Sequence, residues 1–344
     1  MKARLKAIAS HLPSTRLTNE QLAADFPDWT PAKILEKTGI RERRVAAPGE
    51  CASDLGVEAA EKLFASGACR REEIDYLIFC TQSPDYFLPA TACLLQSRLK
   101  LKTSCGALDI NQGCSGFVYG LSLAKGLVET GAAANVLLIT AETYSKFINP
   151  RDRSVRTLFG DGAAASLITA AESERELIGP FVFGTDGTGA HQLIVKAGGH
   201  RTPPTPENAI VKEAEGGNYR SEQNLYMDGP EIFNFTIRVL PETVVRLLEK
   251  AQLTFEQVDW FVFHQANRFM LEFLRRKMRI PTEKFPVAME GCGNTVSSTI
   301  PIVLEQMQAN GQFKPGQQIM LVGFGVGLSW AACMLCVNEN RADC

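Results

Sequence analysis

The chain has 344 residues, more than twice the ~150 residues of a typical single domain, so we expect two domains or one large duplicated domain. Its hydrophobic content of 45% and charged content of 22% are those of an ordinary globular protein, which excludes intrinsic disorder and fibrous structure. Lysine and arginine (36) nearly balance aspartate and glutamate (38), for a net charge of −2, which argues against binding to nucleic acid or to an anionic membrane.

The N-terminus and the cysteines indicate a cytoplasmic protein. Residues 1–10 carry charge but lack the apolar core of a signal peptide. The ten cysteines do not suggest a disulfide framework, because Cys80 ends an apolar, strand-like run and Cys93 lies in a helical, apolar stretch. We expect these thiols, like Cys105, to be free and buried, as in a reducing compartment.

An internal repeat organises the chain. Corresponding features recur in the same order at a nearly constant spacing of about 180 residues. The matched pairs are residues 72–80 and 256–264, Cys114 and Asn294, the helix-stop glycines Gly131 and Gly311, and the strands 136–139 and 319–322. The repeat predicts a duplicated α/β unit with halves 1–175 and 176–344, each a mixed sheet covered by helices.

Cys114 stands at a strand-to-helix junction. An apolar strand ends at Ile110, Asn111-Gln-Gly113 forms a turn, and a helix begins at Cys114. Backbone N–H groups at a helix N-terminus favour a thiolate and lower its pKa. From its position alone, Cys114 is either a nucleophile or a buried structural cysteine.

His264 and Asn294 hold comparable positions in the second half. His264 ends the apolar strand 260–263, so it is either a half-buried structural histidine or an active-site group. Asn294 follows a glycine turn and is expected at the start of a helix, where it can cap the helix, act in a site, or do both. If the halves pack about a pseudo-two-fold axis, these two side chains and Cys114 share one pocket.

Three further segments have alternative interpretations. Residues 198–224, rich in proline and glycine, are predicted to form a surface insertion. Arg268, Arg275 and Arg279 fall on one face of a predicted helix, which is either solvated or binds a phosphate or an acidic carrier protein. The uncharged run 319–337 is long enough for a membrane span, but its glycines favour two buried strands joined by a turn, whose N–H groups could bind an oxyanion.

At these residues the sequence resembles the ketoacyl-acyl carrier protein synthase III family of thiolase-fold condensing enzymes, over nearly the whole chain. The ordered markers are Thr38-Gly-Ile-Arg-Glu-Arg43, Asp109-Ile…Cys114-x-Gly-Phe117, Phe159-Gly-Asp-Gly162, Gly229-x-Glu-Ile-Phe233, His264-Gln-Ala-Asn267, Gly293-Asn-Thr295 and Gly323-Phe-Gly-x-Gly-x-Ser-Trp330. The resemblance implies a thiolase-like duplicated fold of layered helices and two mixed five-stranded sheets (αβαβα).

The resemblance also implies an activity, a decarboxylative Claisen condensation. Cys114 would carry an acyl group from acyl-CoA, and His264 and Asn294 would stabilise the enolate of a malonyl thioester on CoA or an acyl carrier protein. The backbone N–H groups of Cys114 and Val326 would form the oxyanion hole. Neither a metal nor a cofactor is expected, since CoA enters as the carrier of a substrate. The implied substrate contacts are Leu88, Arg153, Gly229, Asn267, Arg268 and Phe269, with Leu88 reaching across a homodimer interface.

Departures from the family pattern suggest a specialised relative rather than the initiator of fatty acid synthesis. Lys33 stands where the family often has a tryptophan for the CoA adenine, and Trp29 lies four residues earlier. Phe269 stands where the family has an arginine, and Val326 lies in the centre of the glycine triplet.

Two other functions remain open from the sequence. The acyl group could pass from Cys114 to a hydroxyl or an amine without decarboxylation, with His264 as the base. Alternatively, the chain could be a non-catalytic partner subunit that keeps the fold for pairing.

Overall fold

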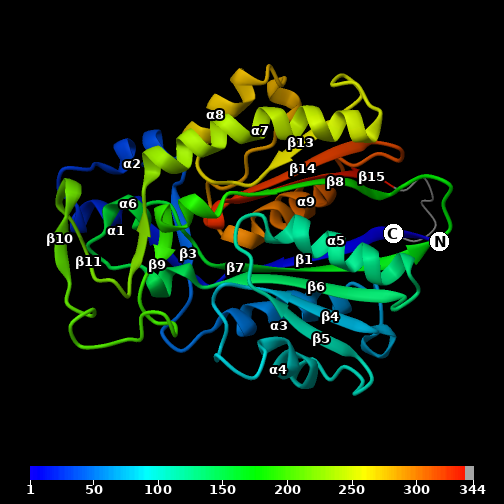
Figure 1. Ribbon diagram of the computed structural model, residues 1–344, viewed down its shortest axis with the longest axis horizontal. Helices are drawn as coiled ribbons and strands as arrows, with labels where there is room; N and C mark the ends of the chain where they lie inside the picture. Colours follow the sequence, from blue (N-terminus) through cyan, green and yellow to red (C-terminus); the bar gives the residue numbers. More distant parts are fainter. Residues whose placement is uncertain (338–344) are drawn as a thin grey trace.

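The computed structural model describes residues 1–337 and consists of five layers, in which two sheets alternate with three layers of helices (Figure 1). Helices pack on both outer faces and between the sheets. The first outer face is covered by α3 (Ala52–Ala65) and α4 (Thr91–Arg98). The middle layer consists of α5 (Gly116–Glu129) and α9 (Thr299–Ala309). The second outer face is covered by α7 (Gly229–Ala251) and α8 (Arg268–Lys277). The predicted αβαβα layering is confirmed.

The first sheet has five strands in the order β1-β7-β6-β4-β5. Their bounds are Lys2–His11 (β1), Gly162–Ala171 (β7), Asn135–Glu142 (β6), Tyr76–Cys80 (β4) and Gly106–Ile110 (β5). Strand β4 runs parallel to β5 and β6, while β7 is antiparallel to β1 and β6, so the sheet is mixed, as expected. Because helices cover both faces, β4 and β6 are almost continuous apolar runs.

Within residues 1–337 the second sheet has four strands, so the expectation of five is wrong for the described part of this half. Their order is β13 (Trp260–Phe263), β14 (Gln318–Gly325), β15 (Ser329–Cys336) and β8 (Ile178–Thr185). By analogy with β5, the missing strand would lie beside β13. Residues 285–289 do not form it, and they include Pro286, which has no N–H to donate. Instead the side chain of Gln265 accepts from the Ala288 N–H at 2.9 Å and takes the place of a backbone ladder.

The middle helices carry the core shared by both sheets. Phe117, Val118 and Leu121 of α5 and Ile300 and Val303 of α9 are fully or almost fully buried in one cluster with both sheets. A helix covered on two sides must be apolar around most of its surface, and both helices are. Burying each large side chain stabilises the fold by about 1.5–3 kcal/mol, which holds the start of each middle helix in place.

The apolar run near the C-terminus forms two strands, as predicted. Strands β14 and β15 pair in antiparallel register and are joined by the 3-10 turn η7 (Val326–Leu328). Within residues 1–337, no helix has the length and apolarity needed to cross a bilayer.

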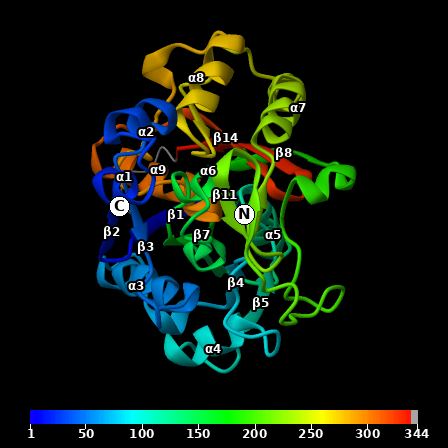
Figure 2. The ribbon, with the colours of Figure 1, turned by 90° about the vertical axis from the view of Figure 1, so that its left-hand side faces the viewer.

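The short elements gather at one end of the molecule, at the left of Figure 1 and facing the viewer in Figure 2. They are β2 (Thr15–Thr18), α1 (Asn19–Asp25), α2 (Pro31–Thr38), β3 (Glu42–Val45), α6 (Arg153–Arg156), β9 (Leu193–Val195), β10 (Lys212–Ala214), β11 (Asn218–Arg220) and β12 (Leu225–Met227). Residues 198–224 lie mostly at the surface here, as predicted, and include the β10–β11 pair.

One cysteine is not where the sequence suggested. Cys80 and Cys105 are buried and free, as expected, but Cys93 is exposed. Helix α4 covers the first sheet with only one face, formed by Ala92 and Leu95. Position 93 points about 100° away from its buried neighbour, toward solvent.

Candidate active site

Cys114 lies between the end of β5 and the start of α5. The residue after it, Ser115, is the N-cap of α5, but its hydroxyl pairs with Ser329 Oγ on β15 at 2.6 Å and does not cap the helix. The positive end of the helix dipole is therefore left beside the Cys114 side chain, which is 5% exposed.

The turn after β14 encloses the Cys114 sulfur. A Cβ built on Gly325 would lie 2.6 Å from Sγ, and the φ of Gly325 is 157°, so only glycine fits this approach. The next backbone N–H, that of Val326, and the N–H of Cys114 itself face the thiol and act to lower its pKa. Two N–H groups thus converge on the sulfur.

The expected lowering of the Cys114 pKa is wrong for the free enzyme. Burial raises the pKa of the thiol to about 12, and the two N–H groups offset only part of that increase. The helix start favours the thiolate, but removal of the sulfur from water costs more. Cys114 is therefore a neutral thiol at rest.

His264 follows β13 and is 1% exposed. Its Nδ1 lies 2.7 Å from Thr299 Oγ1, and its ring packs edge-on against Phe324 with centroids 5.4 Å apart. Burial lowers the pKa of His264 to about 3, although a hydrogen bond to the Val296 backbone raises it in part. The imidazole is therefore neutral across the physiological range.

Asn294 is not at the start of a helix, contrary to the prediction. The 3-10 turn η6 (Val296–Ser298) follows it, and α9 begins only at Thr299. Its Oδ1 accepts from the Val296 N–H at 2.9 Å, and its amide nitrogen donates one hydrogen to the Ala266 carbonyl at 3.5 Å, which leaves the second amide hydrogen for a ligand. The Val296 φ of 55° is rare for a β-branched residue and costs about 1–3 kcal/mol, which indicates a tightly held turn.

The backbone of Asn294 joins the two halves of the fold. It forms an isolated bridge with Phe159, in which the Asn294 N–H donates to Leu158 O at 2.9 Å and the Gly160 N–H donates to Asn294 O at 3.0 Å. This contact holds Asn294 beside the first half, which contributes Cys114.

Cys114, His264 and Asn294 line one narrow cavity of about 70 Å³. Its other lining residues are Leu158, Phe159, Leu193, Met227, Gly229, Ile232, Ala266, Asn267, Met270, Phe324 and Gly325. None of these side chains is a lysine, arginine, aspartate or glutamate. Besides Cys114, His264 and Asn294, the only polar side chain that lines the cavity is that of Asn267. The cavity therefore presents a thiol, an imidazole and an amide within an apolar wall.

The remaining sequence-predicted residues divide into two groups. Gly229 and Asn267 line the cavity, and Asn267 also caps α8 by accepting from the Met270 N–H at 2.9 Å. Leu88, Arg153, Arg268 and Phe269 do not line it; Leu88 is 82% exposed and Phe269 is 63% exposed.

The predicted arginine face is shorter than expected. Helix α8 ends at Lys277, so Arg279 lies beyond it, in a left-handed conformation. Arg275 is held by Glu272 at 3.0 Å and by the Ile280 carbonyl. Arg268 packs over Gly39, and its guanidinium lies 3.5 Å from Glu290. These ion pairs leave no continuous basic stripe along the helix.

Trp29 and Arg153 are in contact, which the sequence did not predict. The Arg153 guanidinium lies 4.9 Å from the Trp29 ring centroid and also donates to the Gly216 carbonyl at 3.0 Å. Lys33, at the family's tryptophan position, has its Nζ 5.3 Å from the same ring. Trp29, which lies just before α2, therefore places an aromatic ring beside Arg153.

Glu142 is a buried carboxyl near the thiol that sequence reasoning missed. It ends β6 and is fully buried, and it accepts hydrogen bonds from the Gln82 N–H, Ser83 Oγ and Ser297 Oγ. Burial raises the pKa of Glu142 to about 8, and its charge raises the pKa of Cys114. No pattern around Glu142 distinguished it from an ordinary strand end.

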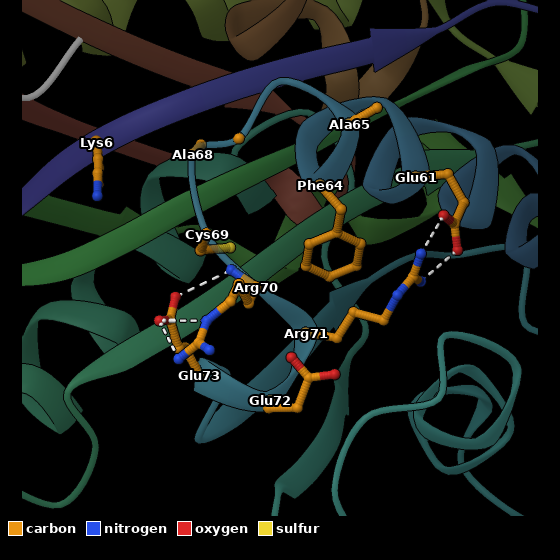
Figure 3. Close-up of a pocket in the computed structure, with 11 residues that line it drawn as sticks. Lys6, Glu61, Phe64, Ala65, Ala68, Cys69, Arg70, Arg71, Glu72 and Glu73 are labelled. Atoms are coloured by element: carbon orange, nitrogen blue, oxygen red, sulfur yellow. Dashed lines mark hydrogen bonds and ion pairs between the residues drawn. The ribbon is translucent and has the colours of Figure 1, made fainter.

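A larger, open groove of about 640 Å³ lies at the end of α3 (Figure 3). Cys114, His264 and Asn294 do not line this groove. Its arginines are already paired, Arg70 with Glu73 and Arg71 with Glu61. Burial raises the pKa of Cys69, its one thiol, to about 11. With its arginines paired and its thiol strongly protonated, the groove offers no activated nucleophile, so the chemistry is not assigned to it. Within residues 1–337, no cluster of three or more metal-binding side chains is present either.

Comparison with known proteins finds the same family in both halves of the chain. Residues 108–187 match 3-oxoacyl-[acyl-carrier-protein (ACP)] synthase III, and residues 248–337 match the C-terminal part of the same family. The beta-ketoacyl-[acyl-carrier-protein] synthase III of Caldanaerobacter subterraneus is 36% identical over 329 residues, which is 95% of each chain.

Solved structures agree with this match. The crystal structure of a 3-oxoacyl-(acyl-carrier-protein) synthase III is 58% identical, covers 98% of this chain and all of its own, and superposes with a TM-score of 0.97. A 3-oxoacyl-(acyl-carrier protein) synthase from Burkholderia xenovorans is 39% identical, with 98% and 95% coverage and a TM-score of 0.90.

Proposed function

Because this chain belongs to the 3-oxoacyl-[acyl-carrier-protein] synthase III family, we propose that it condenses an acyl group, carried on Cys114, with a malonyl thioester. It is an acyltransferase that forms a carbon–carbon bond by decarboxylative Claisen condensation. The observation that carries the residue assignment is the single cavity lined by Cys114, His264 and Asn294.

In the first half-reaction, the sulfur of Cys114 attacks the thioester carbonyl of acyl-CoA. The Cys114 S–C bond forms, the bond to CoA breaks, and the proton lost by the thiol is balanced by the proton that the CoA thiolate gains. One thioester replaces another, so the free-energy change is small. The N–H groups of Cys114 and Val326, which meet at the sulfur, are suited to stabilise the oxyanion of the tetrahedral intermediate.

In the second half-reaction, the malonyl thioester loses CO₂ and its enolate carbon attacks the acyl carbonyl. The Cys114 thiolate leaves and regains a proton. His264 and Asn294 donate hydrogen bonds to the thioester oxygen as it becomes an enolate. The uncharged, apolar wall that includes Phe324 disfavours a carboxylate and so favours its conversion to CO₂. This chemistry requires neither a metal nor a bound cofactor.

The acyl donor is proposed to be a CoA thioester whose adenine contacts the surface formed by Trp29 and Arg153. The support is the Arg153 guanidinium over the Trp29 ring, since an aromatic ring and a cation together suit a purine with adjacent phosphates. We propose that the extender rides on an acyl carrier protein or on CoA. Gly229 and Asn267 would then contact the pantetheine arm, and Arg268 and Phe269 the carrier outside the cavity.

We further propose a homodimer to which Leu88 contributes. The support is an exposed apolar run, since Tyr86, Phe87 and Leu88 are 62%, 80% and 82% exposed in the single chain. Such a run is unfavourable in water and typical of an interface. Analytical ultracentrifugation at micromolar concentration should give a dimer that Leu88→Asp dissociates; a monomeric wild-type protein would contradict the proposal. We also propose a cytoplasmic location, which is supported by the free thiols of the cysteines within residues 1–337.

The deciding experiment separates the two half-reactions. Intact-protein mass spectrometry after incubation with a panel of acyl-CoAs should show one acyl adduct, which Cys114→Ala abolishes. Addition of a malonyl thioester should then release CO₂ and discharge the adduct. Discharge to a hydroxyl or amine without CO₂ would instead indicate simple acyl transfer, and no adduct at all would indicate a non-catalytic subunit.

A further inference from the structure

The carboxyl of Glu142 joins the two halves of the chain beside the candidate site. Glu142 is the last residue of β6 and is fully buried. Its Oε2 accepts from the Gln82 N–H at 3.0 Å and from Ser83 Oγ at 3.1 Å, and both of these donors belong to the first half. Its Oε1 accepts from Ser297 Oγ at 2.9 Å, in the turn η6 of the second half. One carboxyl therefore ties this turn to the first half.

The position of Glu142 has an equivalent in the second half. The internal repeat matches β6 with β14, and Glu142 and Gly325 are the last residues of these strands. Gly325 lies against Cys114, just before the middle helix α5 of the first half. Glu142 contacts Ser297, just before the middle helix α9 of the second half. Each strand end thus meets the opposite half at the start of its middle helix.

The turn η6 orients the amide of Asn294. The Val296 N–H donates to Asn294 Oδ1 at 2.9 Å, and this bond fixes the direction of the amide nitrogen. Val296 makes the bond with a φ of 55°, a conformation that is rare for a β-branched residue. Such a conformation persists only where surrounding contacts impose it. A loss of those contacts would let Val296 relax and turn its N–H away from Asn294.

The contacts that follow Val296 attach the turn to the first half. Ser298 Oγ lies 3.0 Å from the carbonyl oxygen of Thr140, an acceptor that any residue at position 140 would supply. The bond of Ser297, in contrast, requires the side chain of residue 142. We propose that Glu142 is a positioning residue that holds the turn η6, through Ser297, in the form in which the Asn294 amide can donate to the enolate.

This inference rests on the proposed condensation and adds a residue to it. Glu142 does not line the cavity, so its effect on Asn294 passes through the turn. The N–H groups proposed for the first half-reaction, those of Cys114 and Val326, lie outside η6. Loss of the bond between Glu142 and Ser297 should therefore slow the second half-reaction and spare the first.

The first test removes the serine hydroxyl. We expect Ser297→Ala to load acyl-CoA on Cys114 at the wild-type rate, measured by intact-protein mass spectrometry. It should release CO₂ from the malonyl thioester about 10–100-fold more slowly, the range for losing a group that orients a functional side chain. The control is Ser166→Ala, since Ser166 is fully buried in β7 and its hydroxyl has no hydrogen-bond partner within residues 1–337; it should condense normally.

Two outcomes of this test would overturn the proposal. One is CO₂ release by Ser297→Ala at the wild-type rate. The other is a parallel loss of loading and CO₂ release, because a serine that merely supports the fold would affect both steps. Failure of the proposed function would be seen in the wild-type protein instead, as no acyl adduct on Cys114 or no release of CO₂.

The second test compares two changes of Glu142. Glu142→Gln preserves the bond, because a serine hydroxyl can accept from an amide as well as donate to a carboxyl. At pH 7 it should release CO₂ close to the wild-type rate, whereas Glu142→Ala should be slow, like Ser297→Ala. The double variant Glu142→Ala/Ser297→Ala should be no slower than the slower single variant, because both changes remove one bond. Effects that multiply would overturn the proposal, and Ser297→Ala decides it alone if Glu142→Ala does not fold.

Discussion

The backbone of Gly325 lies directly against the sulfur of Cys114, so closely that a Cβ on residue 325 would approach Sγ to 2.6 Å. The two residues come from opposite halves of the chain, Gly325 at the end of β14 and Cys114 before α5. The space that an acyl group must enter is therefore defined by a contact between the halves.

Gly325→Ala should block acylation. The added methyl group meets the sulfur, and the φ of 157° strains any residue with a side chain. A displacement of about 1 Å at a reacting atom can cost a hundredfold in rate, so we expect at least that loss in the rate of acyl-adduct formation, measured by mass spectrometry. Gly126→Ala, on α5 with no atom within 4 Å of its new Cβ, is the control and should load normally. Normal loading by Gly325→Ala would contradict the assignment of this turn.

Asn294 should matter for condensation and not for acylation. Asn294→Ala is expected to form the acyl adduct but to release CO₂ about 10²–10³-fold more slowly, the usual cost of one lost oxyanion donor. Asn294→Asp is the informative comparison, because it keeps the acceptor for the Val296 N–H, loses the amide donor and adds a carboxyl group that disfavours an enolate. If the aspartate variant condenses like wild type, Asn294 acts as an anchor for the turn and not as a donor.

Glu142 should control the pH at which Cys114 reacts. The carboxyl, whose pKa is about 8, becomes charged above that pH and then raises the pKa of the thiol further. Glu142→Gln removes this charge, so the pH profile of Cys114 alkylation by iodoacetamide should move to lower pH. Peptide mass spectrometry measures each cysteine separately. Cys292 is the internal reference, because its raised pKa comes from burial and has no contribution from Glu142. An unchanged Cys114 profile would exclude the coupling.

Trp29 should contribute to binding of CoA and not to chemistry. We expect Trp29→Ala to raise KM for acyl-CoA roughly tenfold, in the range of one base-stacking contact, and to leave kcat nearly unchanged. The matched substrate is an acyl-pantetheine, which lacks the adenine. Steady-state kinetics should show no effect of Trp29→Ala on that substrate, and an equal effect on both substrates would place the adenine elsewhere.

Much of the fold was predictable because its signals are local. The strand runs ending at Cys80 and His264, and the apolar run that became β14 and β15, are short stretches whose composition reports burial on both faces. The missing fifth strand of the second sheet was not predictable from the repeat. The segment in its place contacts the side chain of Gln265, which donates to the carbonyl of Pro286, 21 residues later in the chain.

The residues of the candidate site also divide into those that the sequence could predict and those that it could not. Cys114 and His264 stand at strand ends, and strand ends can be read from sequence. Thr299 and Glu142 reach the site only through packing, with contacts such as that between Ser297 and Glu142 that span 155 residues. No periodicity or motif encodes such a contact.

The sequence by itself determined the family, the duplicated architecture and the residue types that carry the chemistry, because motif spacing and apolar runs are properties of neighbours along the chain. Only the tertiary structure decided that Cys114 is a neutral thiol, that Asn294 precedes α9 by a strained turn, and that Trp29 stands against Arg153. Desolvation and contact are sums over atoms gathered from the whole chain, so they exist only once the two halves have packed together.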